Sequence, residues 1–297
     1  LPKPGRMTLA PMLKEDGKLQ GDLTVACLAE DDWMLFGSGM AEVFYARWFE
    51  RHMPVDGSVQ LEVIGLGLCG LSIAGPKSRD LLQRLTGEDV SNAGLRFMGF
   101  RRMDVAMAPC FVGRVSFTGD LGYEIWMKPE YQRQVFDRLL AEGADLGLKP
   151  FGLRALNAMR LEKNFGGWAR EYRPVYGPLE AGLSRFVAYE KGDFIGRDGA
   201  LAERETGGKL RLLSFVVDAD EADVIGDEPI SLNGDVVGWV TSGGFAHHSG
   251  VSVAQGYVPK DMADADGPWS IELLGRPLAA RPQRVALFDA NAERMRA

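Results

Sequence analysis

The amino-acid sequence predicts an α+β protein that ends in a small β-barrel domain. Up to about residue 205, segments that alternate apolar and polar residues are mixed with segments of helical periodicity. After the polar stretch 203–208, short strand-like segments recur at regular spacing. We therefore predict a first domain at 1–205, which carries an α+β insert at about 46–145, and a β-barrel domain at 206–297.

The first domain is predicted to begin with a small sheet. Alternation and composition predict strands at 7–13, 23–28, 33–36 and within 59–75, and a hairpin over 112–127. Helical periodicity, with a helix-start proline at Pro76, predicts helices at 40–52, 76–85, 131–143 and 151–163.

The barrel domain is predicted from strand spacing and turn chemistry. Its expected strands cover 210–217, 229–232, 235–241, 252–258 and 269–274. Asn233-Gly234 lies between two apolar runs and is a strong hairpin signal, and Gly243-Gly244 is predicted to be a second turn.

The composition excludes several classes of function. The net charge of −7 argues against nucleic acid or an anionic membrane as a partner, and no run approaches the roughly 18 apolar residues of a membrane span. Three scattered cysteines and three histidines show no metal-ligand spacing, so we predict no metal centre and a reducing, cytoplasmic compartment. The start at Leu1-Pro2, without an initiator Met, suggests a piece of a longer polypeptide.

The segment from Ser116 to Trp126 is the most informative part of the chain. Gly119, Asp120 and Gly122 predict a tight turn, after which Glu124 stands in an aromatic, half-buried strand. A carboxylate in such a place needs a partner, and a flat ligand with adjacent N–H donors, such as a pterin, would supply one. The alternative is a hairpin whose Glu points to solvent.

Three other features have both a functional and an ordinary interpretation. Asp22 follows Gly21 at the mouth of an apolar strand, where it could orient or deprotonate a ligand nitrogen or simply form a turn. Arg160 could extend a polar stripe on its helix or belong to a solvated face. Trp168 lies in a loop rich in aromatic and cationic residues, which could line a site or serve as a packed linker.

The glycine pattern at 65–70 matches the dinucleotide fingerprint G-x-G-x-x-G. That fingerprint requires a helix directly after it, whereas Leu71 to Gly75 continues as a strand in our prediction. We therefore interpret the pattern as a glycine-rich turn.

Taken together, these segments resemble the aminomethyltransferase (glycine-cleavage T-protein) family of folate-dependent one-carbon transferases. The resemblance is carried in order by segments around Asp22 and Glu124, by Met159 to Lys163, and by Val237 to Gly244 in the barrel. The sequences of Trp168 to Tyr172 and of Lys191 to Arg197 most resemble the C-terminal folate domains of dimethylglycine and sarcosine dehydrogenases.

The resemblance implies a three-part folate-binding fold with tetrahydrofolate in the central hole where the parts meet. It implies that Asp22 is the catalytic carboxylate beside the reactive folate nitrogens and that Glu124 binds the pterin N–H groups. Arg160 would lie in the folate pocket, either contacting the cofactor or holding a carboxylate in place, and Trp168 would supply an aromatic wall. The same site would include four further residues of the matching segments: Phe117, Tyr123, Met34 and Ser38.

Several departures from the family pattern accompany the resemblance. Phe117 stands where the family often has Tyr, and Met34 and Ser38 replace a Tyr and an Asn, which weakens polar recognition. The family's opening segment, about seventy to ninety residues by the size of a usual domain, is absent from this sequence.

The function implied is formation of 5,10-methylenetetrahydrofolate from an iminium derived from an N-methyl amine. A flavin oxidase domain, in the same chain or a separate one, would deliver that substrate, because the sequence carries no convincing FAD-binding motif. Two alternatives remain open: a demethylase that gives 5-methyltetrahydrofolate, and a folate-binding module without turnover.

Overall fold

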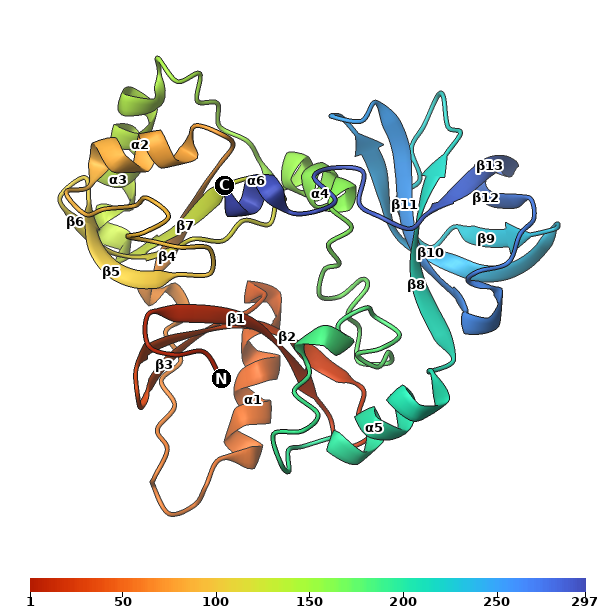
Figure 1. Ribbon diagram of the computed structural model, residues 1–297, viewed down its shortest axis with the longest axis horizontal. Coiled ribbons are helices and arrows are strands. Elements are labelled where there is room, and N and C mark those ends of the chain that lie inside the picture. Colours follow the sequence, from red (N-terminus) through yellow and green to blue (C-terminus); the bar gives the residue numbers. More distant parts are fainter.

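The computed structural model describes all 297 residues, which form three parts around the middle of the molecule (Figure 1). The first part is a three-stranded antiparallel sheet in the order β1-β2-β3, and helix α1 packs against it. These elements are β1 (Arg6–Leu13), β2 (Leu19–Ala29), β3 (Asp32–Phe36) and α1 (Glu42–His52). Tyr45 of α1 joins Leu23 and Val25 of β2 in one buried apolar cluster, which fixes the helix on the sheet.

The second part is inserted in the chain between α1 and α4 (Leu153–Glu162). It is a four-stranded antiparallel sheet in the order β4-β7-β6-β5, with two helices packed on one face. Its elements are β4 (Cys69–Ala74), α2 (Ser78–Leu85), β5 (Phe100–Val105), β6 (Ala108–Gly113), β7 (Gly122–Met127) and α3 (Pro129–Gly143). The largest apolar cluster of the protein, with 18 buried residues, lies between this sheet and its helices.

The third part is a closed six-stranded barrel in the order β10-β11-β8-β13-β12-β9. Its strands are β8 (Leu210–Val217), β9 (Pro229–Leu232), β10 (Asp235–Ala246), β11 (Val251–Pro259), β12 (Trp269–Leu273) and β13 (Arg276–Gln283). Asn233 and Gly234 both have positive φ values, 56° and 92°, as the tight turn between β9 and β10 requires. The predicted α+β class with a C-terminal barrel is thus confirmed.

Short helices and the end of the chain connect the three parts. Helix α4 packs against β10 of the barrel, and α5 (Arg197–Thr206) leads into β8 (Figure 1). After the barrel the chain returns to the insert, where α6 (Glu293–Arg296) brings Arg294 to within 2.8 Å of Asp120. Four 3₁₀ turns complete the secondary structure: Gly39–Ala41, Gly65–Gly67, Ser184–Phe186 and Lys260–Met262.

The first two sheets face each other. Phe36 of β3 packs on Trp126 of β7 with ring centroids 4.8 Å apart. Phe36 is paired with Thr24, so both lie on the face of the first sheet that also carries Asp22, because alternate residues of a strand share a face. By the same rule, Trp126 shares its face of the second sheet with Glu124. The two faces that carry the predicted site carboxylates are therefore turned toward one another.

Two predicted local features are wrong. The strand predicted within 59–75 is limited to β4, and residues 59–68 form no strand. The glycine pattern at 65–70 is divided between the 3₁₀ turn at Gly65–Gly67 and the start of β4. Gly243-Gly244 is not a turn, since both residues lie inside β10 and pair with β11. A Cβ at Gly243 would lie 2.3 Å from the carbonyl oxygen of Val224, so glycine serves there to admit a neighbouring backbone.

Candidate functional site

Asp22 is a half-buried carboxylate in the middle of β2. Its Oδ1 atom is buried and has no hydrogen-bond partner in the protein. Burial raises the pKa of Asp22 to about 6, and only its own backbone N–H partly offsets this effect. A carboxylate with such a pKa can exchange a proton near neutral pH, and its unpartnered oxygen is available to a ligand.

Tyr45 lies directly behind Gly21, the residue that precedes Asp22. The Tyr45 hydroxyl is buried without a partner, and a Cβ at position 21 would lie only 2.3 Å from it. Burial and, secondly, the negative charge of Asp22 raise the pKa of Tyr45, so the phenol remains a neutral donor. Glycine is required at position 21 because any side chain would collide with this ring.

The segment that follows α4 runs alongside β2. The Leu19 N–H donates to the carbonyl oxygen of Tyr176 at 2.8 Å, Tyr172 shares an apolar cluster with Leu19, and Trp168 packs against the cluster that contains Leu23. The segment therefore passes β2 on both sides of the Asp22 position. The Trp168 Nε1 atom is also buried without a partner.

Glu124 occupies a central strand of the insert sheet, between β4 and β6. Its register partners are Ser72 and Gly113, and its side chain is half-buried. Burial raises the pKa of Glu124, and the neighbouring Trp126 side chain partly offsets the effect, with no charged group contributing. This carboxylate therefore lacks a cationic partner within the protein, as a ligand-binding acid would.

Arg160 is buried at the junction of α4 with the barrel. Its guanidinium donates hydrogen bonds to five acceptors: Asn157 Oδ1, the Phe165 carbonyl, Glu171 Oε2, Ser242 Oγ and Gln255 Oε1. The ion pair with Glu171 measures 3.0 Å. Because the protein itself occupies these donors, Arg160 holds a carboxylate and two barrel side chains in place in this structure.

Phe117 lies in the loop between β6 and β7, and it is partly exposed. Its ring stacks on Phe165 with centroids 5.9 Å apart and an interplanar angle of 14°. Ser116 Oγ and Thr118 Oγ1 are 2.7 Å apart and fix the loop on either side. The pair of rings forms a flat apolar wall between the insert and the segment after α4.

The structure places the other three predicted residues less favourably for ligand contact. Tyr123 points into the insert core, away from the Glu124 face, and its fully buried hydroxyl accepts a hydrogen bond from Arg79 at 3.2 Å. Met34 is buried in the apolar cluster between the two sheets. Ser38 precedes the first 3₁₀ turn, where its carbonyl accepts from the Ala41 N–H. Tyr123 is therefore a core residue, because strand alternation directs it away from the site.

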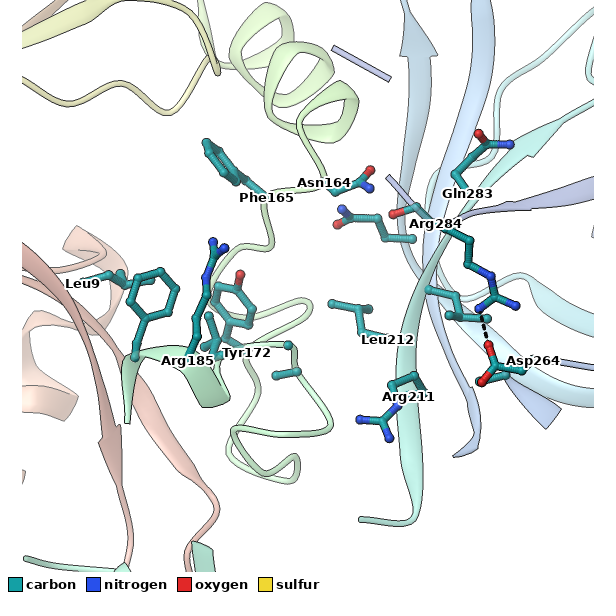
Figure 2. Close-up of a pocket in the computed structure, with 18 residues that line it drawn as sticks. Leu9, Asn164, Phe165, Tyr172, Arg185, Arg211, Leu212, Asp264, Gln283 and Arg284 are labelled. Carbon is teal, nitrogen blue, oxygen red and sulfur yellow. Dashed lines mark ion pairs between the residues drawn. The ribbon is translucent and has the colours of Figure 1, made fainter. Parts of the chain in front are cut away.

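A cavity of about 400 Å³ lies between the first sheet, the segment after α4 and the barrel (Figure 2). This volume is within the range of roughly 300–1,000 Å³ that is usual for small-molecule sites. Figure 2 shows Phe165 near the end of α4, Leu9 and Arg185 on the side of the first sheet, and Arg211 on the barrel side. Arg284, also in its wall, forms an ion pair of 2.8 Å with Asp264.

None of the predicted site residues lines this cavity directly, but three of its lining residues adjoin them. Phe165 stacks on Phe117, and Gln255 accepts a hydrogen bond from Arg160. The third, Tyr172, follows the Glu171 that Arg160 holds. A larger cavity of about 830 Å³ lies elsewhere, along β1 and the end of α1, and contains no predicted site residue.

Sequence reasoning missed Tyr45 and Tyr172. Tyr45 belongs to the apolar face of a helix whose existence was predicted, and Tyr172 follows the predicted Trp168 by four residues. What marks them is a hydroxyl group within reach of the charge of Asp22, and this relationship exists only in three dimensions. No group of three or more His, Cys, Asp or Glu side chains could hold a metal ion. No helix is long and apolar enough to cross a bilayer.

The comparisons with known proteins agree with this architecture. The family model described as the GCVT N-terminal domain matches residues 2–191, and that of the glycine cleavage T-protein C-terminal barrel domain matches residues 211–289. The crystal structure of the glycine cleavage system aminomethyltransferase T from Bartonella henselae superposes with a TM-score of 0.84 at 25% identity, covering 98% of this chain and 78% of that one.

The curated relatives include three kinds of enzyme. Human dimethylglycine dehydrogenase is 34% identical over 278 residues, which are 93% of this chain and 32% of the relative. The aminomethyltransferase of Halothermothrix orenii is 32% identical over 88% of this chain and 72% of the relative. The formaldehyde-forming 4-methylaminobutanoate oxidase of Paenarthrobacter nicotinovorans is 34% identical over 77% of this chain and 28% of its own length. The chain thus spans about a third of the dehydrogenase and most of the aminomethyltransferase.

Proposed function

Because this chain belongs to the glycine cleavage T-protein family of aminomethyltransferases, we propose that it performs tetrahydrofolate-dependent one-carbon transfer. The reaction would form 5,10-methylenetetrahydrofolate from an iminium derived from an N-methyl amine, with release of the demethylated amine and one proton. Sequence similarity to three kinds of relative supports the amine substrate. A dimethylglycine dehydrogenase and a methylaminobutanoate oxidase match the chain, as do aminomethyltransferases. A flavin oxidase domain, in the same or another chain, would generate the iminium.

The observation that carries this proposal is the buried, unpartnered oxygen of Asp22. A buried carboxylate oxygen without a hydrogen-bond partner is destabilised unless a ligand pairs with it. Asp22 would accept a hydrogen bond from a folate nitrogen, hold it in place and receive its proton. A carboxylate whose pKa is about 6 is well suited to this exchange, because it is ionised at pH 7 yet readily protonated.

The remaining residues fit a reduced folate. Glu124 would accept the paired N–H groups of the pterin, since a carboxylate binds adjacent donors in parallel and Glu124 has no ion pair of its own. Trp168 would provide an aromatic wall with a free N–H, and Phe117 stacked on Phe165 a second wall. Tetrahydrofolate supplies the nucleophilic nitrogen that accepts the one-carbon unit.

Calorimetric titration of tetrahydrofolate, followed by product assays with an N-methyl amine and a flavin oxidase, tests the proposal. We expect Asp22→Asn to keep most of the folate affinity and to abolish product. Formation of 5-methyltetrahydrofolate instead of the methylene product would favour the demethylase. Folate binding without any product, unaffected by Asp22→Asn, would identify a binding module, and no binding by folded protein would refute the proposal.

A further inference from the structure

Tyr172 holds a hydroxyl proton that no protein group accepts. The side chain is 8% exposed and lines the cavity of about 400 Å³ shown in Figure 2. Its oxygen accepts a hydrogen bond of 3.1 Å from the Gly166 N–H, and this is the one hydrogen bond of the phenol. A phenol both donates and accepts, so its donor function remains free.

The backbone around Tyr172 is held firmly. The preceding residue, Glu171, is fully buried and accepts hydrogen bonds from Arg160, the Gly167 N–H and Thr241. On the other side of the ring, a Cβ at Gly166 would lie 2.6 Å from the ring carbons, so glycine lets the loop close on the phenol. The Tyr172 hydroxyl is therefore held in one position at the wall of the cavity.

That position lies beside Asp22. Leu9 of β1 packs against the cluster that contains Tyr172, and both residues line the same cavity. Leu9 is the register partner of Thr24, and Asp22, two residues before Thr24, lies on that same face of the sheet. After burial, the negative charge of Asp22 is the largest influence that raises the pKa of Tyr172, and the opposite charges of Glu171 and Arg160 have smaller effects.

We infer that Tyr172 is a further ligand-binding residue, which donates its hydroxyl proton to the same ligand group whose N–H faces Asp22. The Tyr172 hydroxyl lacks an acceptor and Asp22 Oδ1 lacks a donor, so both atoms can form hydrogen bonds with the same ligand group. The group they recognise has an N–H and a lone pair on the same or adjacent atoms, as in a secondary amine or a ring amide. This inference rests on the proposed function and extends it by naming the chemistry that the Asp22 site selects.

The test compares Tyr172→Phe with Tyr189→Phe. Both tyrosines belong to the same buried cluster, but the Tyr189 hydroxyl is 2.8 Å from Ser184 Oγ and serves as the matched control. Losing one hydrogen bond of about 1 kcal/mol should weaken tetrahydrofolate binding about fivefold in Tyr172→Phe only. In an Asp22→Asn background the same substitution should have less than about half that effect, because the two residues share one ligand group.

If the hydroxyl has a purely structural role, Tyr172→Phe should lower tetrahydrofolate affinity equally in the wild-type and Asp22→Asn backgrounds, or Tyr172→Phe and Tyr189→Phe should lower it equally. Either result would overturn the inference. A second readout needs no folate. The Asp22 carboxyl resonance, assigned by its loss in Asp22→Asn, reports its pKa by NMR in the free protein. We expect Tyr172→Phe to raise that pKa and Tyr189→Phe to leave it unchanged. If wild type binds no folate, the proposed function fails, while an unchanged Asp22 pKa in Tyr172→Phe refutes the proximity on which the inference depends.

Discussion

Arg160 donates a hydrogen bond of 3.0 Å from Nη1 to Oε2 of Glu171, and the two side chains are 6% and 0% exposed. Glu171 also accepts from Thr241 of β10 at 2.6 Å, and its carbonyl accepts from Tyr257 of β11. One buried ion pair thus joins α4, the segment that borders β2, and the barrel. The positions of Trp168 and Tyr172 along β2 depend on this junction.

Glu171→Ala should strongly destabilise the protein. Removing one partner of a buried pair leaves an uncompensated charge and costs roughly 3–5 kcal/mol. Chemical denaturation measures the loss in the free energy of unfolding. The exposed pair of Arg138 with Glu142 on α3 provides the control, since Arg138→Ala should cost only about 0.5 kcal/mol. Similar costs for both variants would contradict the role assigned to the buried pair.

Asp22→Asn should change how stability depends on pH. The pKa of Asp22 is raised from 3.8 to about 6, so the folded state binds this proton more tightly than the unfolded state. The stability that the protonated form contributes is fully present below pH 3.8 and is lost as the pH rises through about 6.

Wild type should therefore be less stable than Asp22→Asn at pH 8, by at most about 3 kcal/mol, and nearly equal to it at pH 4. Denaturant unfolding at both pH values measures this difference. Asp31→Asn, at an exposed turn, should give the same small difference at either pH. A pH-independent gap between wild type and Asp22→Asn would contradict the raised pKa.

Gly21→Ala should destabilise the Asp22 site. The new Cβ would lie 2.3 Å from the Tyr45 hydroxyl, and the ring is only 4% exposed, so the contact cannot relax freely. Overpacking of this kind costs typically about 1–3 kcal/mol. Thermal unfolding should show a clear decrease in the midpoint, whereas Gly39→Ala, which has no atom within 4 Å of the added group, should show almost none. A neutral Gly21→Ala would mean that Tyr45 moves readily.

Glu124→Gln should weaken tetrahydrofolate binding. An amide offers one acceptor where the carboxylate offers two, and hydrogen bonds to a charged group are worth about 1.5–3 kcal/mol, so we expect at least a tenfold loss in affinity. Calorimetry measures the change. Glu130→Gln on the exposed first turn of α3 is the matched control and should bind as wild type does. Equal affinities for all three proteins would exclude Glu124 from the site.

Several elements escaped prediction for identifiable reasons. Strand β13 begins Arg276-Pro277 and is mostly polar or small, so its sequence carries no alternation, and it is a strand because β8 and β12 flank it in the closed barrel. Helix α5 lies between Gly196 and Gly207, which both have a left-handed backbone conformation. Its C-terminal half is polar and coincides with the predicted boundary between the two domains. Gly243 resembled a turn residue because a sequence does not show which backbone will approach it.

The sequence by itself determined the α+β class, the barrel and the family, because local periodicity, turn residues such as Asn233-Gly234 and the order of motifs are all written along the chain. It also singled out Asp22 and Glu124, since a carboxylate in an apolar strand is conspicuous in any sequence. Only the tertiary structure turned their two sheet faces toward each other and brought Tyr45 and Tyr172 beside Asp22. Those relationships depend on packing between residues as far apart as β2 and the segment after α4, and the cost of an unpaired buried group arises only once that packing excludes water.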